Sequence, residues 1–180
     1  MALPTIGDLT SYPALERPDL LGPGVAAALR SWAGADQVAV VEIDPELADT
    51  AALNEAYGLS PADSANCVVV SGKRAGEERI AACVVRADTK ADVNHVVKAL
   101  LDTRKASFHP HDRAVEETGM EYGGITPIGL PQEWRLLVDA RCVQIPTALI
   151  GSGVRRSKLL LPGSAFAELP RVEVVEGLAT

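Results

Sequence analysis

The chain has 180 residues, of which 47% are hydrophobic and 23% charged, and these values favour one globular domain over a disordered chain. Its formal net charge of −7 excludes a global attraction to nucleic acid, so any RNA contact must come from a local basic patch. The three cysteines form no C-x-x-C pair, and neither a secretion signal nor a membrane-spanning apolar run is recognisable. We therefore expect a cytoplasmic domain without cofactor or metal that binds neither membrane nor DNA.

Proline, glycine and apolar periodicity divide the chain into an arm and a domain. Residues 1–22 are rich in proline and aperiodic, so we expect an N-terminal arm there and the domain at 23–180. In chain order the expected elements are a helix at 25–32, a strand at 37–43, a helix at 49–57, a helix start at 60–63, strands at 67–71 and 79–86, a helix at 89–101, a strand at 106–108, a helix at 112–118, strands at 135–139, 147–151 and 158–161, a helical turn at 164–169 and a strand at 172–175. The core must be aliphatic, because only 4% of the residues are aromatic. A single α/β domain follows, with a mixed, mostly antiparallel sheet or barrel flanked by helices.

A glycine-rich segment, Met120–Leu130, is the strongest candidate for a binding loop. Gly123, Gly124 and Gly129 surround Pro127 in this segment. Glycine leaves the backbone accessible and proline makes it rigid, so exposed amides here can hold an ester carbonyl, a carboxylate or a phosphate. The alternative interpretation is a tight connection between two elements.

Six segments in order resemble the YbaK/prolyl-tRNA-synthetase-associated domain family, whose members hydrolyse mischarged aminoacyl-tRNA. The resemblance covers about two thirds of the chain. The segments are Ala65–Val70, Val84–Asp88 with Ala91–Asn94, Lys105–Pro110, Gly123–Gly129, Leu137–Asp139 and Gly151–Gly153.

The resemblance implies substrate-assisted hydrolysis at the glycine loop. The amides of Gly123, Gly124 and Ile125 would stabilise the oxyanion, and Pro127 would keep the loop rigid. Asp139 is the second catalytic candidate, as a partner for the α-ammonium group of the substrate. The alternative for Asp139 is that it caps the next turn.

One departure from the family pattern concerns its usual lysine, since Asn66 occupies that position. Asparagine can still donate a hydrogen bond but carries no charge. We expect Asn66 to bind substrate, together with the loop and turn residues Thr126, Gly151, Ser152 and Gly153.

Two basic clusters are candidates for contact with the acceptor stem of tRNA, although solvated charged faces are the common alternative. Their residues are Arg104, Lys105, Arg155, Arg156 and Lys158. The His109-Pro-His111 pair has no nearby third ligand, which makes a metal site improbable. Cys67 has no basic neighbour in sequence to activate it, so we expect a buried structural thiol.

These observations favour a trans-editing deacylase that acts on tRNA carrying a small wrong amino acid. Its partners would be the aminoacylated 3′ end of tRNA and an aminoacyl-tRNA synthetase. The alternative is a catalytically lapsed homologue that binds aminoacyl-tRNA or a synthetase without hydrolysis. A third hypothesis is hydrolysis of an unrelated small ester in the same pocket.

Overall fold

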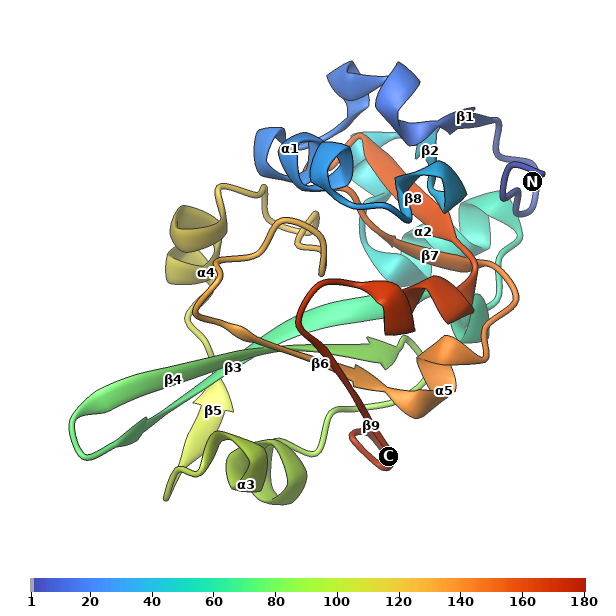
Figure 1. Ribbon diagram of the computed structural model, residues 1–180. Helices are drawn as coiled ribbons and strands as arrows, with labels where there is room; N and C mark the ends of the chain where they lie inside the picture. The colour runs from blue at the N-terminus through green and yellow to red at the C-terminus, as the bar shows by residue number, and fades with distance from the viewer. Residues whose placement is uncertain (1) are drawn as a thin grey trace.

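The computed structural model describes residues 2–180 and contains two sheets surrounded by helices (Figure 1). The first sheet has the order β1-β2-β8-β7, and all of its strand pairs are antiparallel. Its strands are β1 (Ser11–Pro13), β2 (Ala39–Glu42), β7 (Ala148–Gly151) and β8 (Ser157–Leu161).

The second sheet has the order β5-β3-β4-β6-β9 and is mixed, because β6 runs parallel to both β4 and β9. Its strands are β3 (Ala65–Arg74), β4 (Glu77–Arg86), β5 (Ala106–Phe108), β6 (Arg135–Asp139) and β9 (Val172–Val175). Between the sheets, β7 reaches the start of β3 through one isolated bridge, Ser64 to Leu149. Over residues 2–180 the sheets therefore do not close: the mixed, mostly antiparallel α/β domain is confirmed, and the barrel alternative is wrong.

The helices lie around these sheets. They are α1 (Pro23–Ser31), α2 (Thr50–Tyr57), α3 (Lys98–Leu101), which follows a π-helical turn at Val93–Val97, α4 (His111–Thr118) and α5 (Ala140–Val143). Short 3-10 turns occupy 14–16, 18–20, 35–37, 45–47, 61–63 and 163–168. The helix expected from residue 60 is therefore a single turn, because Ser64 already leads into the long strand β3.

Strand alternation sorts the apolar side chains into three clusters. Val40 and Leu159 of the first sheet and Val84 of the second share the central cluster between the sheets. The neighbouring residue Leu160 faces outward onto α2, while Val85 faces outward onto α3. Because side chains on a strand point alternately to opposite faces, each sheet is buried on both sides, which agrees with its aliphatic composition.

The segment expected to form an arm is built into the first sheet. Ser11–Pro13 forms its edge strand β1, and Leu20 and Leu21 are buried in the central cluster. The boundary at residue 22 stays a prediction. In Figure 1 this segment and α1 lie at the top, while the β3–β4 hairpin projects to the left and α3 lies at the bottom.

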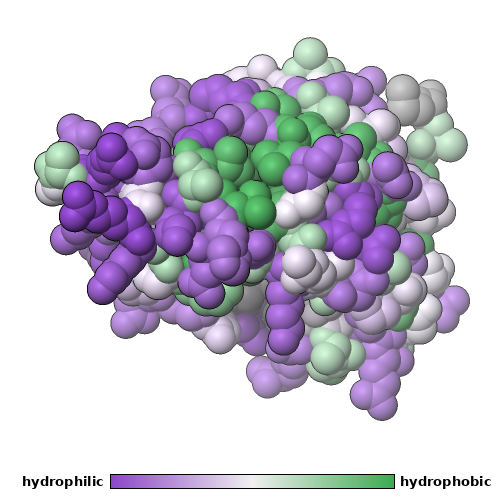
Figure 2. All heavy atoms as spheres, turned by 90° about the horizontal axis from the view of Figure 1, so that it is seen from below, coloured by the Kyte–Doolittle hydropathy of each residue, from purple (hydrophilic) through white to green (hydrophobic). Residues whose placement is uncertain are grey.

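The face seen from below in Figure 1 is mostly hydrophilic at its rim and has hydrophobic side chains gathered in its middle (Figure 2). Among residues 2–180, no helix has the length and hydropathy needed to cross a membrane.

Candidate functional site

The glycine loop lies against the end of β7 and the turn that follows it. Gly123 has a φ of +79° and Gly129 a φ of +87°, conformations that favour glycine. The amide of Gly153 donates to the carbonyl of Gly124 at 2.7 Å, and the amide of Glu121 donates to the carbonyl of Gly153 at 2.9 Å. These reciprocal bonds hold the loop and the turn together as one unit.

Beside this unit is a pocket of about 360 Å³, a volume in the range of small-molecule sites. Residues from five separate parts of the chain line it. They are Asp49, Thr50 and Leu53 from the start of α2, Asn66, Cys67 and Val68 from β3, Tyr122, Gly123 and Ile125 from the loop, Leu149, Ile150 and Gly151 from β7, and His111, Arg155 and Lys158.

Two of the three loop amides expected to be donors are available. Gly123 and Ile125 line the pocket, and within residues 2–180 no acceptor bonds to either amide. The amide of Gly124 instead donates to the carbonyl of Glu121 at 2.9 Å, and Gly124 does not line the pocket. The expectation that Gly124 donates to a substrate is therefore wrong, because the turn itself uses this amide.

Lys158 brings a positive charge into the pocket from β8. The residue is only 6% exposed, and its Nζ lies 3.3 Å from the carbonyl oxygen of Gly123. No carboxylate within residues 2–180 lies close enough to form an ion pair with it. Burial, together with the nearby Arg155, lowers the pKa of Lys158 to about 8, and Asp49 opposes the shift.

Asn66 lies in the same pocket at the open edge of β3. Its Oδ1 accepts a hydrogen bond from the hydroxyl of Thr50 at 3.1 Å. This bond fixes the orientation of the side-chain amide. The amide nitrogen, for which residues 2–180 offer no partner, is left to donate to a ligand.

The model of the aminoacyl-tRNA editing domain family matches residues 44–169. This match spans the loop, the pocket, four of the five strands of the second sheet, and β7 and β8 of the first. The chain belongs to the aminoacyl-tRNA editing domain family.

Solved structures share the fold of this editing domain. A hypothetical protein is 20% identical, with a TM-score of 0.68 over 78% of this chain and 90% of the other. A proposed trans-editing enzyme for prolyl-tRNA synthetase is 18% identical, with a TM-score of 0.71 over 87% and 97% of the two chains. An epitope-scaffold design is also 18% identical, with a TM-score of 0.70 over 86% and 95%. No curated protein matches the sequence.

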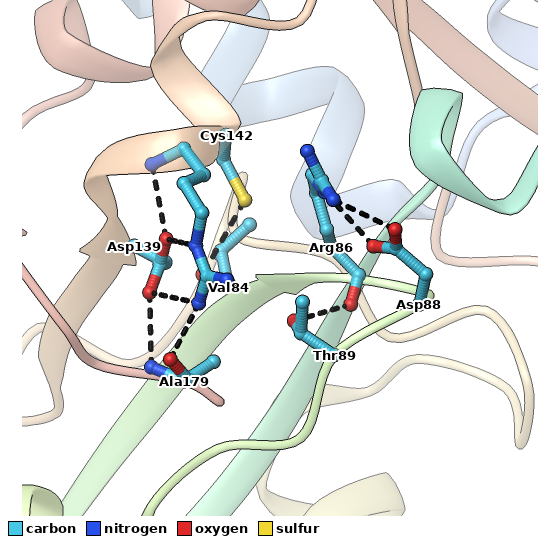
Figure 3. A network of polar contacts seen from close by, with 8 residues as sticks. Val84, Arg86, Asp88, Thr89, Asp139, Cys142 and Ala179 are labelled. Carbon is cyan, nitrogen blue, oxygen red and sulfur yellow. Dashed lines mark hydrogen bonds and ion pairs between the residues drawn. The ribbon is translucent and has the colours of Figure 1, made fainter.

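Asp139 lies outside the pocket of the editing domain. Its carboxylate caps α5 by accepting from the backbone amide of Arg141, and it binds the guanidinium of the same residue. It also accepts from the amide of Ala179 at 2.9 Å (Figure 3). Burial by itself would raise the pKa of Asp139, but these bonds outweigh it and hold the pKa below its ordinary value. The expected contact with a substrate ammonium is therefore wrong, and the capping alternative describes the residue.

Other expected binding residues serve packing. The loop residues Thr126 and Pro127 are buried behind the pocket, where Pro127 faces a separate cavity beside Trp134. Ser152 is buried and its hydroxyl lies 2.7 Å from that of Ser157. Gly153 packs so closely on Gly22 that a Cβ added to Gly153 would lie 3.0 Å from the Cα of Gly22. Of the four loop and turn residues expected beside Asn66, only Gly151 lines the pocket.

The basic residues separate into three environments. Arg155 lines the pocket and donates to the carbonyls of Tyr122 and Pro45. Arg156 bonds to the carbonyl of Asp19, on another part of the surface. Arg104 and Lys105 are exposed beside β5, away from this pocket. Lys158, expected at the RNA surface, is buried instead.

Sequence reasoning missed the role of Lys158 and the presence of Asp49, His111 and Tyr122 in the pocket. One signal for Lys158 was present, because it is a lone lysine in a short apolar strand whose five residues are all buried. Cys67 is half-buried and lines the pocket, so the expected buried position is wrong, although desolvation raises the pKa of its thiol. Within residues 2–180 no group of three His, Cys, Asp or Glu side chains is placed to hold a metal ion.

Proposed function

We propose that this editing domain hydrolyses the ester bond of tRNA that carries a small, wrongly attached amino acid. The observation that carries the proposal is that Gly123 and Ile125, whose amides have no acceptor within residues 2–180, line one pocket together with Lys158. The structural likeness to a proposed trans-editing enzyme, which covers 97% of that chain, supports action in trans. The expected partners are aminoacylated tRNA and its synthetase, in the cytoplasm.

The residues of the pocket account for each part of the reaction. Water attacks the ester carbonyl carbon, and negative charge develops on the carbonyl oxygen, where amides and an ammonium group stabilise it. The carbon–oxygen bond to the ribose then breaks, and the ribose oxygen takes up the proton that the attacking water loses. Lys158 supplies from β8 the charge that Asn66 cannot supply from β3, while Asn66 donates a neutral hydrogen bond.

The pocket also supports a small amino acid as the acyl group. About 360 Å³ must hold this group and part of the terminal ribose, and Leu53, Leu149 and Ile150 are apolar walls. Asp49 is the carboxylate in the lining and takes the place expected for Asp139, facing the α-ammonium group of the substrate.

Purified protein incubated with a panel of tRNAs charged with Cys, Ala, Ser or Pro tests the proposal. We expect release of at least one of these amino acids faster than in buffer. The reaction should be nearly abolished by Lys158→Met but unaffected by Lys73→Met, which removes an exposed lysine of the β3–β4 hairpin. Absence of deacylation with every substrate would contradict the proposal.

The second candidate is a lapsed homologue that binds aminoacyl-tRNA or a synthetase without hydrolysis, and Asn66 favours it. The substitution Asn66→Lys separates the two. If Lys158 already supplies the charge, a second ammonium group is repelled by it and by Arg155, and we expect no gain. Activity that appears only in Asn66→Lys would establish the lapsed homologue.

A further inference from the structure

Two exposed aromatic side chains lie on either side of Asn66. Phe108 is 63% exposed and Tyr122 is 59% exposed, and these are the highest values for large hydrophobic side chains within residues 2–180. Tyr122 lines the first pocket, beside the glycine loop, where the centre of its ring lies 4.8 Å from that of His111. Phe108 lines a second pocket, so both rings stand beside a cavity.

The second pocket, of about 500 Å³, adjoins the first. Both are lined by Asn66 and Val68 of β3. Phe108 of β5 pairs with Val70 of β3, and residues 66, 68 and 70 of one strand share a face. Phe108 therefore stands on the same face of the sheet as Asn66. The two adjoining pockets, which share Asn66 and Val68, are together called the groove.

Basic residues lie in the second pocket and next to the strand that carries Phe108. Lys90 lines the second pocket, whereas Arg104 and Lys105 are exposed outside its lining, just before β5. None of these three forms an ion pair with another residue of the range 2–180. The acid in this pocket, Asp92, is already engaged by the backbone amide and ring of His95.

We propose that the second pocket binds a base of the unpaired 3′ end of tRNA, stacked on Phe108, while the adjoining phosphates face Lys90, Arg104 and Lys105. The inference rests on the proposed function, because it places the next nucleotides of the same substrate. Aromatic platforms beside basic residues are the usual chemistry of single-stranded nucleic acid binding, and stacking tolerates different bases. The overall charge of −7 makes this groove a local site rather than part of a general RNA surface.

Binding of an unacylated single-stranded RNA, ACCA with a 5′ fluorophore, tests the groove directly by fluorescence anisotropy. We expect Phe108→Ala to weaken binding about tenfold or more, and Phe108→Trp to retain it. Val174→Ala is the matched control, because it truncates another exposed apolar residue, on β9 at the far edge of the sheet, and should change nothing. Thermal unfolding verifies that each variant is folded.

The outcomes separate this inference from the proposed function. Phe108→Ala should raise KM for misacylated tRNA about tenfold and leave kcat unchanged, whereas Lys158→Met should lower kcat. Deacylation that is insensitive to Phe108→Ala, or failure of the natural protein to bind the tetranucleotide, would overturn the proposed nucleotide binding in the groove. Neither result would affect the proposed hydrolysis. Tetranucleotide binding that depends on Phe108, without any deacylation, would overturn the proposed hydrolysis and support nucleotide binding in the groove.

Discussion

In the proposed mechanism, Lys158 replaces a charge that Asn66 does not carry. The resemblance predicts a lysine at the position of Asn66, and Asn66 and Lys158 line the same pocket. Lys158 approaches from β8, between Val41 of β2 and Gly151 of β7. Because Gly151 has no side chain, the carbonyls of Gly124 and Ile125 can pack against its backbone.

At the residue scale, we predict that Lys158→Met lowers kcat for deacylation by about 10²-fold, as loss of an oxyanion donor does. In the natural protein the ammonium group loses its proton as the pH rises through about 8, so kcat above the buffer rate should decline there. A pH–rate profile measures both effects. A profile of Lys158→Met that equals that of the natural protein would remove Lys158 from the mechanism.

The substitution Lys158→Met should also stabilise the fold. Since burial lowers the pKa of Lys158 to about 8, the folded state binds this proton less well than the unfolded state. The free energy of unfolding of the natural protein should therefore rise with pH from about 8 to about 10.5. At pH 7, Lys158→Met should be more stable by about 3 kcal/mol, and the gain should disappear near pH 10.5. Urea unfolding at several pH values measures it.

At the element scale, the site depends on close contact between the end of β7 and the glycine loop. A Cβ at Gly151 would lie 2.6 Å from the carbonyl oxygen of Ile125 and 2.7 Å from that of Gly124. Gly151→Ala should therefore displace the loop and reduce deacylation about tenfold or more, because misplaced amides no longer meet the oxyanion. Steady-state kinetics of the folded variant measure this loss.

Gly24→Ala is the matched control for that prediction. Gly24 lies in the first turn of α1, where a Cβ added to it would lie 3.7 Å from the carbonyl oxygen of Gly129, an ordinary contact distance. The φ of Gly24 is not positive. Alanine favours a helix over glycine by up to about 1 kcal/mol, so this variant should keep its activity and gain slight stability. Equal kinetics for both variants would show that the loop tolerates displacement.

At the scale of the whole molecule, Asp139 attaches the C-terminal segment to the second sheet. It joins the end of β6, the start of α5 and the amide of Ala179. Asp139→Asn should lower the free energy of unfolding by about 3 kcal/mol, because it breaks a buried ionic contact, and should leave kcat unchanged. Chemical unfolding together with kinetics tests both parts.

The pH dependence and the control for Asp139 follow from its surroundings. Its pKa is lowered in the fold, so its contribution is present above the unfolded pKa and is lost as the pH falls through the folded value. Asp88→Asn breaks a similar pair with Arg86, but this pair is partly exposed, so the effect should be near zero (Figure 3). A loss of kcat in Asp139→Asn with stability intact would restore its catalytic role.

The sequence predicted those parts of the fold that depend on neighbouring residues. Val172–Val175 and Ala106–Phe108 are strands as expected, and Gly58 and Gly119 end α2 and α4. The missed strand β1 is only three residues long and is held by pairing with β2, so it has no signal of its own. The barrel expectation failed because closure depends on which edges meet, and local pattern says nothing about this.

By itself the sequence determined the family, the glycine loop and most of the strands, because periodicity and backbone preference act over a few residues. Only the tertiary structure decided which side chains share the pocket. Asn66 and Lys158 are far apart in the chain and belong to different sheets; they line one pocket because the two sheets meet where β7 bridges to the start of β3. Asp139 ends a strand as expected, yet its carboxylate points to Ala179, and only the packed C-terminal segment could reveal that.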